Sequence, residues 1–342
     1  MKKILLILLP LVIGMTSCKN EGTNLQGDER VVEMKLSTQV KTYAPGDETA
    51  AEKALNDLTL FVFDGDQATS KLEYTKQAWK KTGSTDTFTT NLKVASGVTI
   101  YFAANVKSFI EALPAGTLDE GMTYAEVLEV LVMGNANSLS TTNGLPMWGS
   151  VKNVDIKDII VNDLGSVKLL RSVASADVFM QLTDPAQFEL QKGHLVFAPN
   201  KGYLPYNDAA SNMDGDQVKA PWAPTGMATT VDIEKPVGTS GKDIAYVFYM
   251  YENNTPLTNN TTNNRPTRVI LEGVYANGKG TATFYPLVFK NASGDQQMAT
   301  RNNKYVMIIT NVNGDGYDTL DEAKNAAPMN VEYKVIPYNV EK

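Results

Sequence analysis

Apolar and polar residues alternate along much of this chain, which is the pattern of β-strands with one face in a core. Near the N-terminus the apolar members of the alternation are Val32, Met34, Leu36 and Val40. Residues 58–63 form a short run rich in β-branched and aromatic residues, closed by the turn signal Asp64-Gly65. Residues 88–94 and 98–104 continue the pattern. The sequence therefore predicts an all-β fold.

A few segments depart from this alternation. Residues 124–133 carry apolar side chains at helical spacing and predict a short helix. Residues 167–182 fit either a helix or a pair of strands, and their β-branched and aromatic residues favour strands. A domain boundary falls most naturally near the start of this segment. We therefore expect one domain over residues 31–164 and a second over residues 165–342.

The second half of the chain has longer polar connections between its strands. It predicts strands over residues 244–251, 268–275, 280–289 and 304–311. The chain closes with a further apolar alternation, formed by Met329, Val331, Tyr333, Val335, Tyr338 and Val340. Its parity changes at Pro337, which is typical of an edge strand or of two short strands.

The N-terminus has the composition of an export signal. A basic start at Lys2 and Lys3 precedes an apolar run over residues 4–13 and a few small residues before Cys18, the only cysteine. Such a run is too short to span a bilayer, but it suits a cleavable signal peptide over residues 1–17. We expect lipid on Cys18 and a flexible polar leader over residues 18–30. A general secretory peptide with an incidental cysteine is the alternative.

Composition argues against several classes of function. The formal net charge is −7 and no basic block is present, which is unsuited to binding nucleic acid. His194 is the only histidine, and no nucleophile motif accompanies it, so we expect a surface histidine. No G-x-S-x-G, H-E-x-x-H, P-loop or paired-cysteine motif occurs in the sequence. We therefore expect no enzyme and no cofactor.

Two local features admit a binding role. Residues 311–322 fit the spacing of a calcium loop, with candidate ligands Asn311, Asn313, Asp315 and Glu322. Asn311 replaces the usual first aspartate and the preceding segment predicts a strand, so a polar hairpin without metal is favoured. The three tryptophans, Trp79, Trp148 and Trp222, could include a sugar-stacking platform, although aromatic residues more often lie in a β-sandwich core.

Together these segments resemble a known family. The lipid-carrying cysteine, the polar leader, LTLFVFD at 58–64, VKLLRSVA at 167–174 and NNKYVMIITNVNG at 302–314 are similar to the fimbrillins, the FimA- and Mfa-type (type V) pilin subunits of certain anaerobic Gram-negative bacteria. The resemblance implies two tandem transthyretin-like β-sandwich domains with a few short helices. It also implies an outer-membrane lipoprotein precursor, palmitoylated at Cys18, that becomes part of a cell-surface fimbria and supports adhesion.

In this family a trypsin-like protease removes the first strand, and a strand of a neighbouring subunit fills the groove by donor-strand exchange. Here the removable strand would carry Val32, Met34, Leu36 and Val40, and the donor strand would carry Met329, Val331, Tyr333, Val335, Tyr338 and Val340. The family's cleaved arginine usually follows the first strand, whereas Arg30 precedes it and the next arginine is Arg171. We therefore expect a cut at Lys41, less favourably at Arg30.

A subunit that keeps its first strand would instead suit a tip or anchor of the fimbria. The expected partners are other copies of the chain or related fimbrial subunits, the outer membrane through lipid, and host or bacterial surface ligands. A monomeric glycan-binding surface lipoprotein is the alternative from a different functional class.

Overall fold

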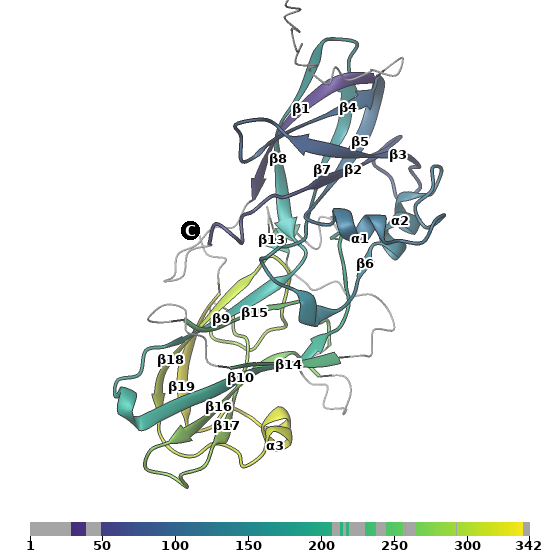
Figure 1. The fold of residues 1–342 in the computed structure, drawn as a ribbon. Helices are drawn as coiled ribbons and strands as arrows, with labels where there is room; N and C mark the ends of the chain where they lie inside the picture. The colour runs from purple at the N-terminus through teal and green to yellow at the C-terminus, as the bar shows by residue number, and fades with distance from the viewer. Residues whose placement is uncertain are drawn as a thin grey trace, which may run out of the picture.

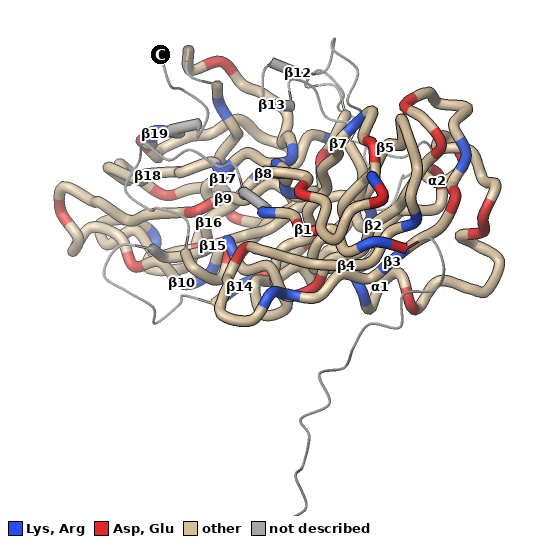
Figure 2. The backbone as a smooth tube through the Cα atoms, turned by 90° about the horizontal axis from the view of Figure 1, so that it is seen from above, with Lys and Arg blue, Asp and Glu red and all other residues tan. Residues whose placement is uncertain are grey.

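The computed structural model describes residues 29–38, 49–206, 213–214, 217–218, 230–236, 244–255, 257, 265–291 and 293–337. The signal peptide, Cys18, Val40, Lys41, Trp222, Tyr338 and Val340 lie outside the described residues. Figure 1 shows a β-barrel at one end of the molecule and a β-sandwich at the other. No helix within the described part is long and apolar enough to cross a membrane. Basic and acidic residues are interspersed along the described backbone (Figure 2).

The first domain is a closed barrel with the strand order β1-β4-β3-β2-β5-β7-β8. Its strands are β1 (Glu29–Thr38), β2 (Leu58–Phe63), β3 (Leu72–Lys80), β4 (Thr87–Lys93), β5 (Ala95–Ala104), β7 (Met147–Ile156) and β8 (Val161–Arg171). The barrel closes because β1 pairs with β4 antiparallel and with β8 parallel. The all-β prediction is confirmed. The first strand, β1, closes the sheet of this domain into a barrel.

The barrel carries a second apolar layer on one outer face. All six residues of β2 are buried, since Leu58, Leu60 and Val62 face the barrel core while Phe61 and Phe63 lie in an outer cluster. That cluster packs against α1 (Lys107–Glu111) and α2 (Tyr124–Val130). A capping box of Thr123 and Glu126 begins α2. The predicted helix is confirmed and is shorter than expected.

The second domain consists of two four-stranded sheets, in the orders β14-β10-β16-β17 and β15-β9-β18-β19. Its strands are β9 (Ala174–Met180), β10 (Phe188–Pro199), β14 (Thr230–Pro236), β15 (Ile244–Met250), β16 (Arg268–Tyr275), β17 (Thr283–Leu287), β18 (Lys304–Val312) and β19 (Val331–Pro337). The facing apolar side chains of the two sheets form one core, which includes Phe248, Leu271, Tyr285 and Met307. A short helix, α3 (Leu320–Asn325), covers part of the β10 and β16 surface.

The structure also contains several shorter elements, one pair of which lies between the domains. A two-residue strand, β6 (Val132–Met133), follows α2 and pairs with β11 (Gly202–Tyr203) after the second domain has begun. The remaining short elements are η1 (Ala136–Ser138), η2 (Pro185–Gln187), β12 (Met213–Asp214) and β13 (Gln217–Val218).

Residues 167–182 form strands, as the sequence analysis favoured. The chain passes from β8 in the barrel to β9 in the sandwich at Ser172 and Val173. This passage lies beyond the expected boundary at residues 164/165, because β8 continues through that position in register with β1. The sequence carries no turn signal at Ser172-Val173 that would have shown the change of sheet.

We expect Gly149→Ala to destabilise the barrel. A Cβ at Gly149 in β7 would lie 2.1 Å from the carbonyl oxygen of Lys168 and 2.8 Å from Leu169 Cδ2. Overpacking of this kind costs typically about 1–3 kcal/mol. Urea unfolding measures the effect, and Gly134→Ala is the matched control because its Cβ would meet only Lys201 Cγ at 3.9 Å. Equal stability of the two variants would contradict this account of the β7–β8 packing.

Candidate functional site

The candidate site is β1 together with the two strands that hold it. Val32 pairs with Thr90 of β4 on one side and with Asn162 of β8 on the other. Val32 and Met34 are 0% exposed and belong to the barrel core. Burying an apolar side chain of this size is worth about 1.5–3 kcal/mol, so these residues make a strong apolar contribution to closure. The sequence analysis placed both on the buried face of this strand.

The outward side chains of β1 make ion pairs at the barrel surface. Glu33 Oε2 lies 2.6 Å from Lys81 Nζ, and Glu29 Oε1 lies 2.7 Å from Lys76 Nζ. Exposed pairs contribute only about 0–1 kcal/mol. Most of the stabilisation of β1 therefore comes from its buried apolar side chains and from its backbone hydrogen bonds to β4 and β8.

Arg30, one of the candidate cleavage residues, lies inside β1. It pairs with Leu92 of β4, and its Nε donates to Asp158 Oδ1 over 2.6 Å. The peptide bond after Arg30 is therefore part of a two-sided strand, and a cut there would leave Val32 and Met34 on the protein side. Lys41, the other candidate, follows β1 in a segment outside the described residues.

Downstream of that segment the chain is anchored between the two domains by Glu52. Thr49 N donates to Glu52 Oε2 over 2.8 Å, which fixes a turn at residues 49–53. Glu52 is 2% exposed and accepts from the Tyr249 hydroxyl of the second domain at 3.2 Å. Arg171 Nη2 donates to the Glu52 carbonyl oxygen over 3.2 Å. The chain after β1 is thus held independently of β1.

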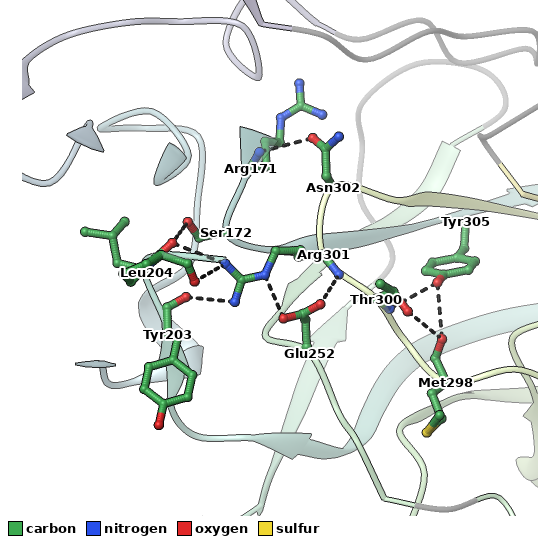
Figure 3. A network of polar contacts seen from close by, with 11 residues as sticks. Arg171, Ser172, Tyr203, Leu204, Glu252, Met298, Thr300, Arg301, Asn302 and Tyr305 are labelled. Atoms are coloured by element: carbon green, nitrogen blue, oxygen red, sulfur yellow. Dashed lines mark hydrogen bonds and ion pairs between the residues drawn. The ribbon is translucent and has the colours of Figure 1, made fainter. Parts of the chain in front are cut away.

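A buried ion pair organises the second contact between the domains. Arg301 Nε lies 2.6 Å from Glu252 Oε2, and both side chains are 1% exposed. The Arg301 guanidinium also donates to the carbonyl oxygens of Tyr203, Leu204 and Pro205, and Ser172 Oγ donates to Leu204 as well (Figure 3). These bonds connect the sandwich to the β11 segment that pairs with β6 beside the barrel. Nothing in the sequence pattern indicated this network.

Lys304 and Asp177 form a third buried group, next to Glu52. Lys304 Nζ lies 2.8 Å from Asp177 Oδ2 and 3.5 Å from Glu52 Oε2, and all three side chains are 2% exposed. Burial raises the pKa of the Asp177 carboxyl to about 6, although Lys304 opposes the shift. Burial likewise raises the pKa of the Tyr249 hydroxyl. The sequence analysis did not identify any of these residues.

The candidate donor strand β19 lies at the edge of its sheet. Among the described strands it pairs with β18 alone, while every strand of the barrel has two neighbours. Val331, Tyr333 and Val335 are partly buried against the sandwich core. The Tyr333 hydroxyl accepts from Val288 N over 3.0 Å, and Met329 lies just before the strand. The alternation read from the sequence thus corresponds to an edge strand that faces a core.

The prediction of a surface histidine is wrong. His194 lies within β10, is 4% exposed, and its Nε2 is 2.9 Å from Glu272 Oε2 of β16. Phe284 lies 6.0 Å away between ring centroids, on the face that α3 covers. The sequence could not show that Glu272 and Phe284, about eighty and ninety residues downstream, lie beside this position.

The residues of the suggested calcium loop have other partners. Glu322 Oε2 accepts from Thr319 N over 3.1 Å and caps α3, while Asn313 Nδ2 donates to Glu332 over 2.7 Å. Asp315 accepts from the backbone of Lys279, and Asn311 donates to Asn313. Among the described residues no group of three or more His, Cys, Asp or Glu residues could hold a metal. The Thr-x-x-Glu capping signature at Thr319 was the signal that the sequence analysis missed.

The tryptophans do not form one platform within the described residues. Trp148 is 1% exposed in the outer apolar cluster and stacks on Tyr101 at a centroid distance of 5.5 Å. Trp79 is 48% exposed on β3.

A similar fold occurs in solved structures of cell adhesion and fimbrial proteins. A putative cell adhesion protein from Bacteroides eggerthii is 19% identical, with a TM-score of 0.56 over 92% of this chain and 97% of that chain. A fimbrilin (FimA) from Porphyromonas gingivalis W83 is 15% identical, with a TM-score of 0.56 over 90% and 96% of the two chains. The tip fimbrial protein Mfa3 from Porphyromonas gingivalis is 17% identical, with a TM-score of 0.52 over 90% and 99%. These likenesses define the class as two-domain β-proteins with the fimbrilin fold.

The sequence of the first domain matches a known family. Residues 31–177 match the family of the major fimbrial subunit protein (FimA). The resemblance found in the sequence is thereby confirmed. A search of curated protein sequences found no significant match.

We expect Arg301→Met to destabilise the contact between the domains. The substitution removes the guanidinium that pairs with the buried Glu252 carboxylate, and breaking a buried pair of this kind costs about 3–5 kcal/mol. Differential scanning calorimetry of the whole chain measures the loss. Lys324→Met is the matched control, since Lys324 pairs with Asp232 at the surface, and its effect should stay below about 1 kcal/mol. Similar losses in the two variants would contradict a special role for the buried pair.

Proposed function

We propose that the protein is a structural pilin subunit of a cell-surface fimbria that polymerises by donor-strand exchange after its first strand has been removed. The observation that carries the proposal is the position of β1, which closes the barrel of a fimbrillin domain by pairing on both sides. Its removal would leave β4 and β8 unpaired along a slot vacated by Val32 and Met34. Open strand edges beside an apolar groove are templates for strand addition.

The edge strand β19 supports the second half of the exchange. Val331, Tyr333 and Val335 alternate along it and present one apolar face, as a replacement for the β1 face requires. Its single neighbour within the described part of the chain is β18, so its release would leave the remaining three strands of that sheet paired. The donor would extend from Met329 to Val340.

Processing is proposed at Lys41. A cut there would release β1 with its leader and with the lipid on Cys18, and would leave Glu52 anchored between the domains. Arg30 is the less favourable site, because it lies in the paired strand. The precursor would be an outer-membrane lipoprotein that the signal peptide exports, and the processed subunit would join other copies or related fimbrial subunits and support adhesion to host or bacterial surfaces.

The same geometry admits a subunit that keeps β1. If no cut occurs, the barrel stays closed and the lipid stays attached, which suits an anchor or tip subunit. A monomeric glycan-binding lipoprotein is the alternative outside this class, and the half-exposed Trp79 is the described aromatic residue that favours it.

Cleavage at Lys41 has a direct test. Treatment of the purified precursor with trypsin should yield a new N-terminus at Thr42 and ladders that survive boiling in detergent, because an exchanged strand is buried on both sides. Lys41→Ala should abolish the ladders, whereas Arg30→Ala, the matched control, should leave them unchanged. A mature N-terminus at Val31 in assembled fibres would contradict removal of the strand.

The donor role of the C-terminus has a separate test. A chain that ends at Asn330 should fold as a monomer, because β19 is an edge strand, and should fail to polymerise after trypsin treatment. Circular dichroism checks the fold and gel electrophoresis checks the polymer. If this chain does not fold, or if it still polymerises, β19 is not the donor.

A further inference from the structure

Three buried side chains outside the proposed exchange site have the composition of a reactive group. Lys304 begins β18 and Asp177 lies in β9, its parallel neighbour. Asp177 pairs with Val306, and Lys304 stands two residues before Val306, so both side chains lie on the same face of the sheet. Glu52 approaches that face from the segment after β1. An amine, a carboxyl group and a second carboxyl group are thus enclosed together.

The distances place the amine beside both carboxyl groups. Lys304 Nζ lies 2.8 Å from Asp177 Oδ2 and 3.5 Å from Glu52 Oε2. Each of the three side chains is 2% exposed, so little water competes for the position. Reacting groups held at about 3–3.5 Å gain most of the advantage of an intramolecular reaction.

The carboxyl group of Asp177 is incompletely satisfied as an ion. Its Oδ1 atom is buried, and no hydrogen-bond partner for it is present among the described residues. Burial raises the pKa of this carboxyl to about 6, which brings the protonated form close to neutral pH. A buried ion pair is stable only when its remaining lone pairs are also satisfied. Loss of its charge therefore lowers the free energy of this buried carboxyl group more than it would that of a carboxylate at the surface.

We propose that Lys304 and Asp177 join through an intramolecular amide bond, with Glu52 as the proton-transfer group. Glu52 first carries one proton from the Lys304 ammonium to the Asp177 carboxylate, and the free Nζ attacks Cγ of the protonated carboxyl, so that the C–N bond forms. Glu52 then carries a second proton from Nζ to the hydroxyl as the C–OH bond breaks, and it ends as the carboxylate that it was at the start. One water molecule leaves, nothing is oxidised or reduced, and no co-reactant is needed.

Condensation of an amine with a carboxylic acid is opposed in bulk water and favoured where water is excluded. The product replaces two buried charges by one neutral amide, which removes most of their desolvation cost. Glu52 retains the Tyr249 hydroxyl and Thr49 N as hydrogen-bond donors, so its carboxylate stays stabilised after the reaction.

The bond would link the strands through which force enters the second domain. β9 follows the barrel directly through Ser172, and β18 precedes β19 along the chain. If β19 serves as the donor, tension on it passes along the chain through residues 313–330 into β18, where a covalent link to β9 would prevent the two strands from separating. This consequence rests on the proposed function, whereas the bond itself does not.

The mass of the denatured full chain tests the proposal without any variant. After incubation at neutral pH the chain should be lighter by one water molecule than its sequence requires. Protease digestion should yield one branched peptide that joins the segment containing Lys304 to the segment containing Asp177. A full mass with two separate peptides overturns the proposal, whether or not the protein forms fimbriae.

Variants test the role of each group. Asp177→Asn should lose ammonia in place of water, a difference that mass spectrometry resolves, while Lys304→Arg should keep its full mass. Glu52→Gln should slow bond formation at least tenfold, measured as the reacted fraction against time after refolding. A reacted fraction that Glu52→Gln leaves unchanged would overturn the role of Glu52.

The chain contains its own control for proximity. Lys324 Nζ lies 2.7 Å from Asp232 Oδ2, as close as the buried pair, but the Asp232 side chain is 43% exposed. No branched peptide should join these residues, and Lys324→Arg should leave the loss of water unchanged. If the exposed pair reacts equally, enclosure of the buried group is not the cause of the reaction.

Discussion

The pairing of β1 on both sides is the constraint on which the first domain depends. A curved sheet of this kind leaves two edges unless one strand joins them, and β1 joins β4 to β8 by antiparallel pairing on one side and parallel pairing on the other. Val32 and Met34 then complete the apolar interior from the same strand. One segment at the end of the chain therefore supplies both the last backbone ladder and part of the core.

This arrangement makes closure strong but separable from the rest of the fold. The segment that follows β1 is held by Glu52, which contacts Tyr249 and Arg171 and does not contribute to the barrel ladder. The ion pair of Arg301 and Glu252 connects the sandwich to the β11 segment in another place. Loss of β1 would thus open the barrel while the contacts between the domains remain. Buried charges that are fully paired specify one arrangement, because any other leaves a charge without a partner.

Periodicity along the chain was sufficient to predict most strands. The alternation at residues 32–40 and 329–335, and the short run at residues 58–63, correspond to β1, β19 and β2. The helix at residues 124–133 was also predictable, since helical spacing is visible within a few turns. These signals depend only on residues that are close together in the sequence, so each element could be predicted without knowledge of its partners.

Long-range contacts account for what was missed. His194 was expected at the surface, yet it lies beside Glu272 of β16 and Phe284 of β17, which are far downstream in the chain. Glu322 matched a calcium ligand by spacing, but it caps α3 because Thr319 lies three residues before it. Tyr249 and Glu252, the side-chain partners of Glu52 and Arg301, are more than forty residues away from them in the sequence. The periodicity of apolar residues along the chain carries no information about contacts between residues so far apart in the sequence.

The sequence by itself determined the β class, the strand positions and the resemblance to the fimbrillins, because each depends on residues that are neighbours in the chain. The tertiary structure alone decided that the first strand closes a barrel, that the last described strand lies at an edge, and that Lys304, Asp177 and Glu52 meet away from water. Those outcomes depend on which sheet edges and which charges meet across the fold, and chain folding brings them together only after the local pattern has been satisfied.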